Sequence, residues 1–365
     1  MTELSRTRCL AAVAVICLWA SAAVRSAGGQ VPDGEIHILP VQGNVYMLVG
    51  AGGNITMSVG PDGILLVDTG TEEMAGTTAE TVFGLAKSVV ASPAPNRCLG
   101  LYCSQTPFGW TSPGLNAVIS SPAPPKPIRY IINTSMDSEH TGGNALLSEL
   151  PPDSPILAVT FPPITVIPTA TVIAHENVFM RMSQPDETGE APTPLRAWPT
   201  ETFHVRSYEL SHFFNGEGIK IYHLPANTDG SSIVYFRYSD VISAGDIIST
   251  TRYPVIDIDR GGSIQGVLEG LEFILDLAIP EFRAQGGTMI VPGHGRLMDT
   301  GDVTNYRNMA TIIRDRIQGL IDMGMTLDQV QAARPTMDYD GLYGSDNGEW
   351  TTRMFVEAVY RSLDP

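Results

Sequence analysis

The sequence predicts a mixed α/β (α+β) fold, a four-layer αββα sandwich in which two β-sheets pack face to face between outer layers of helices. Three observations predict it. The chain has 365 residues, 43% of them hydrophobic, which is enough to build a large core. Short β-rich runs separated by glycine turns occur in both halves. Helical stretches lie among them without the regular strand–helix alternation that a single parallel sheet requires.

The first half begins with a predicted meander of strands. Residues 36–68 contain HILPV, NVYMLVG, NITMSVG and GILLVDTG, with glycines at the turns. The last run is apolar throughout, which predicts a strand buried on both faces. A helix is expected over about 73–90 and a strand over 127–134, and NALLSEL is expected to begin a helix at Asn144.

The second half repeats this pattern. Between residues 203 and 294 the predicted strands are FHVRSYEL, GIKIYHLP, SIVYFRY, DVISAGD and GTMIVPGH, with helices around 262–278 and 303–323. We therefore expect one catalytic-type domain over residues 33–302 and a C-terminal helical tail over 303–365.

The N-terminus has the pattern of a secretory signal. Arg6 and Arg8 precede an apolar stretch from Cys9 to Val24, and small residues follow around Ser26. The alternative is a retained membrane anchor, because this stretch is close to the shortest that spans a bilayer. We expect residues 1–26 to be a signal peptide and the mature protein to be exported, periplasmic or extracellular.

Charge excludes some classes of partner. The signal peptide contains three arginines and one glutamate, so its removal moves the formal net charge from −17 to −19. A field of that sign repels nucleic acid and anionic membranes. A small-molecule substrate is the expected partner.

Two cysteines are left after the signal, Cys98 and Cys103. They lie in an irregular insertion over residues 91–126 that is rich in proline, serine and glycine. Export to an oxidising compartment predicts a disulfide between them, since two thiolates alone make only half a zinc site. An insertion of this length is expected either to cover a functional site or to be disordered.

Candidate metal ligands follow four predicted strands. Hydrolysis at a metal needs histidine and carboxylate ligands delivered to one edge, with a coordination position open for water. The four segments are NTSMDSEHTGGN at 133–144, PANTDG at 225–230, SAGD at 243–246 and VPGHG at 291–295.

In this order, and with VDTG at 67–70, these segments resemble the motifs of the metallo-β-lactamase superfamily over about residues 36–296. The phrase AHEN at 174–177, residues 245–254 and the helical tail resemble, more narrowly, exported β-lactamase-like hydrolases and zinc hydrolases of quinoprotein relay systems. The resemblance implies the αββα fold and a metal site.

The resemblance also implies that the metal site is asymmetric. The family's first motif is His-x-His-x-Asp-His, which here is degenerate. The first metal position would take three histidines, and the residues at those places are Ser135, Asp137 and Asn227. The second position keeps a chemically complete set, Glu139, His140, Asp246 and His294.

One metal ion is therefore expected, zinc first, with manganese or iron as alternatives. Asp137 is a further candidate ligand, because it adds a carboxylate to the same cluster. It is alternatively a candidate general base, and Glu139 is the other carboxylate expected to take part in catalysis.

Three functions follow from these residues. The first is a metal-dependent hydrolase of a small amide, lactam or ester substrate. The second is a non-catalytic exported binding protein with a decayed metal site. The third is a thiol-handling or electron-relay accessory that uses Cys98 and Cys103. Stoichiometric metal would discriminate the first from the second.

Other polar residues are expected to be structural. Asp68, at a strand end, should fix loops under the site through hydrogen bonds. His175 precedes a helix-like run and should cap or orient it. The same structural interpretation applies to His37, His204, His212 and His223.

Overall fold

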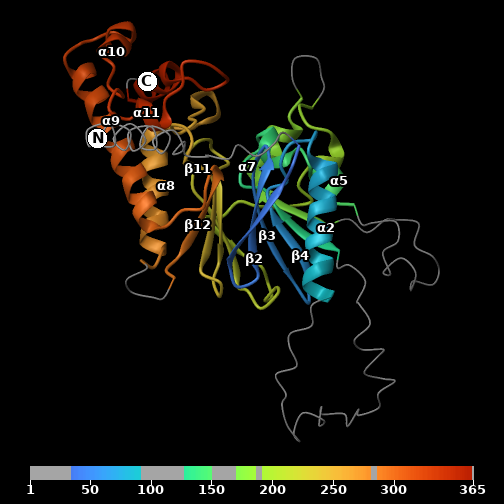
Figure 1. The fold of residues 1–365 in the computed structure, drawn as a ribbon. Coiled ribbons are helices and arrows are strands. Elements are labelled where there is room, and N and C mark those ends of the chain that lie inside the picture. Colours follow the sequence, from blue (N-terminus) through green and yellow to red (C-terminus); the bar gives the residue numbers. More distant parts are fainter. Residues whose placement is uncertain (1–33, 92–126, 150–169, 186–190, 281–285, 364–365) are drawn as a thin grey trace, which may run out of the picture. The chain divides into compact units, whose positions relative to one another are not determined.

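The computed structural model describes residues 34–91, 127–149, 170–185, 191–280 and 286–363 (Figure 1). The predicted signal peptide, nearly all of the 91–126 insertion and the Cys98–Cys103 pair lie outside these residues. The helices of the described part are too short or too polar to cross a lipid bilayer.

The first sheet of the described chain follows the sequence order. An antiparallel meander of four strands leads into parallel pairing from β4 to β7. The strands are β1 (His37–Gln42), β2 (Val45–Ala51), β3 (Gly53–Gly60), β4 (Gly63–Val67), β5 (Ile128–Ile132), β6 (Thr171–His175) and β7 (Glu201–Phe203).

The second sheet contains the strands of the other half. Its neighbours are antiparallel except for the parallel pair of β11 and β12. In spatial order they are β12 (Met289–His294), β11 (Val241–Ser249), β10 (Ser232–Phe236), β9 (Ile219–His223) and β8 (Ser207–Glu209).

The two sheets pack face to face and helices cover both outer faces, which confirms the predicted αββα sandwich (Figure 1). Residues such as Met47, Val67 and Val234 fill the space between the sheets. α2 (Ala75–Ala91) packs on the first sheet. α8 (Ile264–Leu277) and α9 (Thr300–Asp322) pack on the second.

Short helices occupy the strand connections. They are α4 (Ser138–Thr141), α5 (Asn144–Leu147), α7 (Glu176–Ser183), and the 3-10 turns η1 (Leu195–Ala197) and η2 (Ile258–Arg260). β4 is buried at every residue, as its apolar run predicts, because it lies between α2 and the second sheet.

The structure differs from the sequence prediction at FHVRSYEL. Instead of one strand, Phe203 ends β7 in the first sheet and Ser207 begins β8 in the second. The chain crosses between the sheets over the intervening residues. α9 also starts three residues earlier than expected, since Asp299 and Asp302 form a capping box at its N-terminus.

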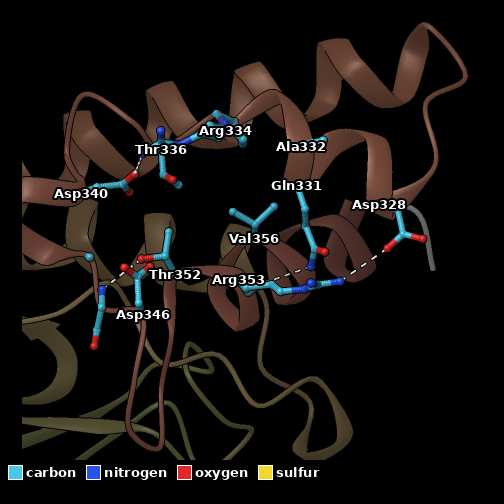
Figure 2. Close-up of a pocket in the computed structure, with 13 residues that line it drawn as sticks. Asp328, Gln331, Ala332, Arg334, Thr336, Asp340, Asp346, Thr352, Arg353 and Val356 are labelled. Atoms are coloured by element: carbon cyan, nitrogen blue, oxygen red, sulfur yellow. Dashed lines mark hydrogen bonds and ion pairs between the residues drawn. The ribbon is translucent and has the colours of Figure 1, made fainter.

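The C-terminal tail packs on the second sheet's helices. It contains α10 (Leu327–Ala333), α11 (Asp340–Tyr343) and α12 (Thr352–Leu363). A pocket of about 710 Å³ lies among these three helices, and Arg353 lies 3.5 Å from Asp328 at its edge. Figure 2 shows the residues that line it. Phe355 of α12 is fully buried and stacks on Tyr253 with ring centroids 4.6 Å apart. Tail and sheet thus share one hydrophobic core.

Candidate metal centre

Three of the predicted ligands meet at the ends of different elements. His140 comes from the short helix α4, which follows β5. Asp246 lies in β11, where the register to β12 shifts between Gly245 and Ser249, and His294 is the last residue of β12. Their ligand atoms all lie within 4.8 Å of one another. We call these three residues the His-Asp-His cluster.

The donor atoms of the His-Asp-His cluster have no hydrogen-bond partner in the described chain. These buried atoms are His140 Nε2, His294 Nε2 and Asp246 Oδ1. The nitrogens lie 3.2 Å and 3.4 Å from oxygens of Asp246, and His294 Nε2 also lies 2.8 Å from Glu139 Oε2, but none of these contacts is aligned as a hydrogen bond. Buried polar atoms are rarely left without a partner, and a cation among them would satisfy all three. The cluster therefore fits a metal ion.

Asp68 orients the imidazole of His140. Its Oδ2 lies 2.8 Å from His140 Nδ1, and both carboxylate oxygens accept hydrogen bonds from Thr134, one from the backbone N–H and one from the hydroxyl. With Nδ1 protonated and donating to Asp68, the lone pair of Nε2 is free on the side of Asp246. Asp68 is thus a structural partner of the site.

The local charges favour a cation. Burial opposes ionisation of Asp246, but the neighbouring His140 outweighs it and holds the pKa of Asp246 well below its usual value. Burial likewise opposes protonation of His140, but the Asp68 and Asp246 carboxylates raise its pKa well above the usual value. The carboxylates of Asp68 and Asp246 thus stabilise a positive charge beside them.

Glu139 lies beside the His-Asp-His cluster. Its Oε2 is 2.8 Å from His294 Nε2 and 3.4 Å from a guanidinium nitrogen of Arg252. The contact with His294, opposed by burial, holds the pKa of Glu139 below its usual value. Glu139 is therefore a carboxylate at neutral pH, close to one of the two imidazoles.

The side chains at the other predicted positions form hydrogen bonds with neighbouring side chains or with backbone carbonyls. Asp137 accepts a hydrogen bond of 2.8 Å from Ser135 Oγ and one of 3.0 Å from Arg260. The side-chain amide of Asn227 donates to the carbonyl oxygens of Asp246 and Val255 at 2.8 and 2.6 Å. Ser135 and Asp137 are thus engaged with each other and with Arg260, whereas Asn227 is held by backbone carbonyls and keeps a buried Oδ1 without a hydrogen-bond partner in the described chain.

Two arginines of the site were not predicted from the sequence. Arg252 lies near Glu139 and Asp246, at 3.4 and 3.7 Å. Arg260 pairs with Asp137 and also lies 3.4 Å from Asp257. No motif marks either arginine. The only signal was their place in the loops that follow the strand carrying Asp246.

A pocket of about 600 Å³ lies at the cluster. Asp246 and Glu139 line it, together with Asn227 and both arginines. Its remaining wall includes Glu349 and Trp350 from the loop between α11 and α12, and loop residues from the first half of the domain. The pocket of Figure 2 contains none of the cluster residues.

His175 lies outside the His-Asp-His cluster. It is the N-cap of α7, where its Nδ1 accepts a hydrogen bond from the Asn177 backbone N–H. Its ring stacks on His223 with centroids 3.5 Å apart. This capping role agrees with the sequence interpretation.

The comparison with known families decides the identity of the fold. The sequence profile of the metallo-beta-lactamase superfamily matches residues 39–315. The chain belongs to this superfamily. The match includes all seven predicted site positions from Ser135 to His294. Metallo-β-lactamase proteins usually bind metal ions such as zinc, and this member has a His/Asp/His arrangement that could hold one.

One solved structure supports this fold. The sec-alkylsulfatase Pisa1 from Pseudomonas sp. is 14% identical, with a TM-score of 0.53 over 89% of this chain and 50% of that chain. The chain described here thus spans about half the length of the alkylsulfatase. A metallo-beta-lactamase from Pontibacter korlensis is 12% identical, with a TM-score of 0.44 over 76% and 99%. No curated protein matches the chain.

Proposed function

We propose that the protein is an exported hydrolase that uses one metal ion to cleave a small amide, lactam or ester substrate. One observation carries the proposal. The buried donor atoms of His140, Asp246 and His294 lie within 4.8 Å of one another without hydrogen-bond partners, at a pocket large enough for a small molecule.

The residues that would hold the ion are His140, Asp246 and His294, with Glu139 beside them. Two imidazole nitrogens with carboxylate oxygens suit zinc, and iron or manganese are the alternatives. A bound ion would supply Lewis acidity and lower the pKa of water to near neutrality.

The chain's own groups would prepare the proton transfers. Asp68 holds His140 with Nδ1 as the donor, so that Nε2 is available. Glu139 and Asp137 line the pocket as candidate proton acceptors. Ser135 Oγ donates to Asp137 Oδ2, and Arg260 bonds to the other oxygen, so this carboxylate is held in one orientation.

The test is metal analysis of mature protein purified without chelator. We expect about one metal per chain in the parent protein and a loss of bound metal in His140→Ala and His294→Ala. His204→Ala is the matched control, since His204 is exposed and outside the cluster. Intact mass would show whether the chain begins after Ser26, as export with signal cleavage requires.

A substrate screen should follow on the metal-loaded protein. It should contain amides, β-lactams and esters, and also secondary alkyl sulfates, because the alkylsulfatase shares the fold. Hydrolysis that is lost in both ligand variants and kept in His204→Ala would support the proposal.

The second candidate is a non-catalytic exported binding protein on the same fold. It is favoured by Asn227, whose side-chain amide is committed to two backbone carbonyls. Absence of bound metal after zinc, manganese and iron have each been offered would overturn the hydrolase and support this binding protein.

A further inference from the structure

We propose that the pocket at the His-Asp-His cluster binds substrates that carry a positively charged amino group. This inference rests on the proposed function in one respect only: the bound molecule is taken to be the substrate. The charges and hydrogen-bonding groups of the pocket wall favour such a ligand.

Among the described residues, the pocket wall has no arginine or lysine that is free to pair with an anionic substrate. Its two lining arginines are both already in contact with carboxylates. Arg252 lies 3.4 Å from Glu139 and 3.7 Å from Asp246. Arg260 lies 3.0 Å from Asp137. A carboxylate or sulfate on the ligand would have to displace one of these partners.

Three carboxylates of the pocket wall have no such partner. Glu72, Glu73 and Glu349 line the pocket and are exposed. The hydrogen bonds and ion pairs among the described residues include none that uses their side-chain oxygens. Glu72 and Glu73 precede α2, whereas Glu349 belongs to the loop before α12, so two distant parts of the chain supply the same charge.

Asn227 provides an independent sign of a hydrogen-bond donor on the ligand. The residue lines the pocket and is only 5% exposed. Its Nδ2 donates to two backbone carbonyls, which fixes the orientation of the amide. Its Oδ1 is buried and has no donor within the described chain. An ammonium group could donate to this oxygen, whereas an anion could not.

Trp350 adds an aromatic surface to the same wall. It follows Glu349 directly and is half-buried. Ammonium groups are attracted to the faces of aromatic rings, most strongly to tryptophan. The carboxylates, Asn227 and Trp350 therefore favour the same kind of ligand, and the net charge of −17 would steer it to the protein.

The test measures binding of three probes with the same apolar chain, n-hexylammonium, n-hexanol and n-hexanoate, by calorimetry. We expect hexylammonium to bind about tenfold more tightly than hexanol, given the modest strength of exposed charge pairs. The preference for hexylammonium should persist in chelator-treated protein, where none of the three probes can coordinate a metal. Equal binding of all three probes, tighter binding of hexanoate in both states, or no binding would overturn the proposal.

Charge variants locate the effect. The triple variant Glu72→Gln, Glu73→Gln, Glu349→Gln should lose the preference for hexylammonium. The matched control is Glu35→Gln, Glu80→Gln, Glu176→Gln, which removes the same charge from exposed residues outside the pocket and should keep it. If both triple variants lost the preference for hexylammonium equally, the preference would depend on the overall charge and not on the carboxylates of the pocket. A protein that takes up no zinc, manganese or iron but still prefers hexylammonium would overturn the hydrolase and leave the amine site standing.

Discussion

Asp68 has an unusual backbone as well as a central contact. Its φ is 64°, a left-handed conformation that aspartate and asparagine tolerate better than other non-glycine residues. From this conformation its carboxylate reaches both Thr134 and His140. The residue therefore couples the end of β4 to the tautomer of a candidate metal ligand.

Replacing Asp68 by asparagine should weaken metal binding without unfolding the chain. Asparagine keeps the left-handed backbone and one acceptor for Thr134. An amide N–H facing His140 Nδ1 would, however, favour the tautomer that protonates Nε2. We expect an affinity loss of about 10- to 100-fold, typical of partners that orient a metal ligand, measured by competition with a chelator.

The control for this substitution is Asp276→Asn, an exposed residue of α8. It should bind metal like the parent protein. Unchanged affinity in Asp68→Asn would show that the Asp68–His140 contact does not set the availability of Nε2.

At the scale of secondary-structure elements, His175 contacts three: β6, α7 and β9. It ends β6, caps α7 and stacks on His223 at the end of β9. Burial, together with the nearby His223, lowers its pKa from 6.5 to about 4. The folded state therefore takes up a proton at this ring only in more acidic solution than the unfolded state does.

This shift predicts an acid-sensitive contribution to stability. Between pH 6.5 and 4 the unfolded chain binds the proton and the folded chain does not, so the free energy of unfolding should fall as pH falls through this window, by at most about 1.4 kcal/mol per pH unit. Urea unfolding from pH 7 to 4.5 should show a flatter dependence in His175→Phe than in the parent protein.

His175→Asn provides the second variant, because it can still cap α7 but has no imidazole. Both substitutions should flatten the pH dependence, although His175→Phe also loses the cap. If both retain the slope of the parent protein, another group causes the acid sensitivity.

The sequence predicts where strands and helices lie better than it predicts which sheet each strand joins. Alternation and apolar runs locate most strands because they depend on local burial, as at β4. They could not separate β7 from β8, since alternation looks the same in either sheet. The ligand positions could be predicted because they follow strand ends in a recognisable order. The positions of Arg252 and Arg260 at the site could not be predicted. Each lies there because of the course of its loop, which the sequence pattern does not reveal.

At the scale of the whole molecule, the tail is part of the core. The cluster that contains Ile242 and Ile290 of the second sheet also contains Val330 of α10 and Phe355 of α12. Tyr253, which stacks on Phe355, directly follows Arg252 in the pocket wall. Packing of the last helix is thus continuous with the wall of the site.

Phe355→Ala should destabilise the entire described domain. Truncation of a fully buried phenylalanine costs about 3–5 kcal/mol, and the cavity would lie in the shared core. Urea unfolding should give one transition at lower denaturant. Met354→Ala is the control, since Met354 is 41% exposed and its truncation should cost less than about 1 kcal/mol. A separate early transition for the tail would show that it folds independently.

The last residues of β12 have a further consequence for the comparison of related sequences. A Cβ atom at Gly293 would overlap Asp246 Oδ1 and the backbone of Gly245. Glycine is thus the only residue that leaves room for this carboxylate. A homologue could keep every histidine and aspartate of the cluster and still lose the site through one added methyl group. Surveys that score only the ligands would count such an inactive gene as intact.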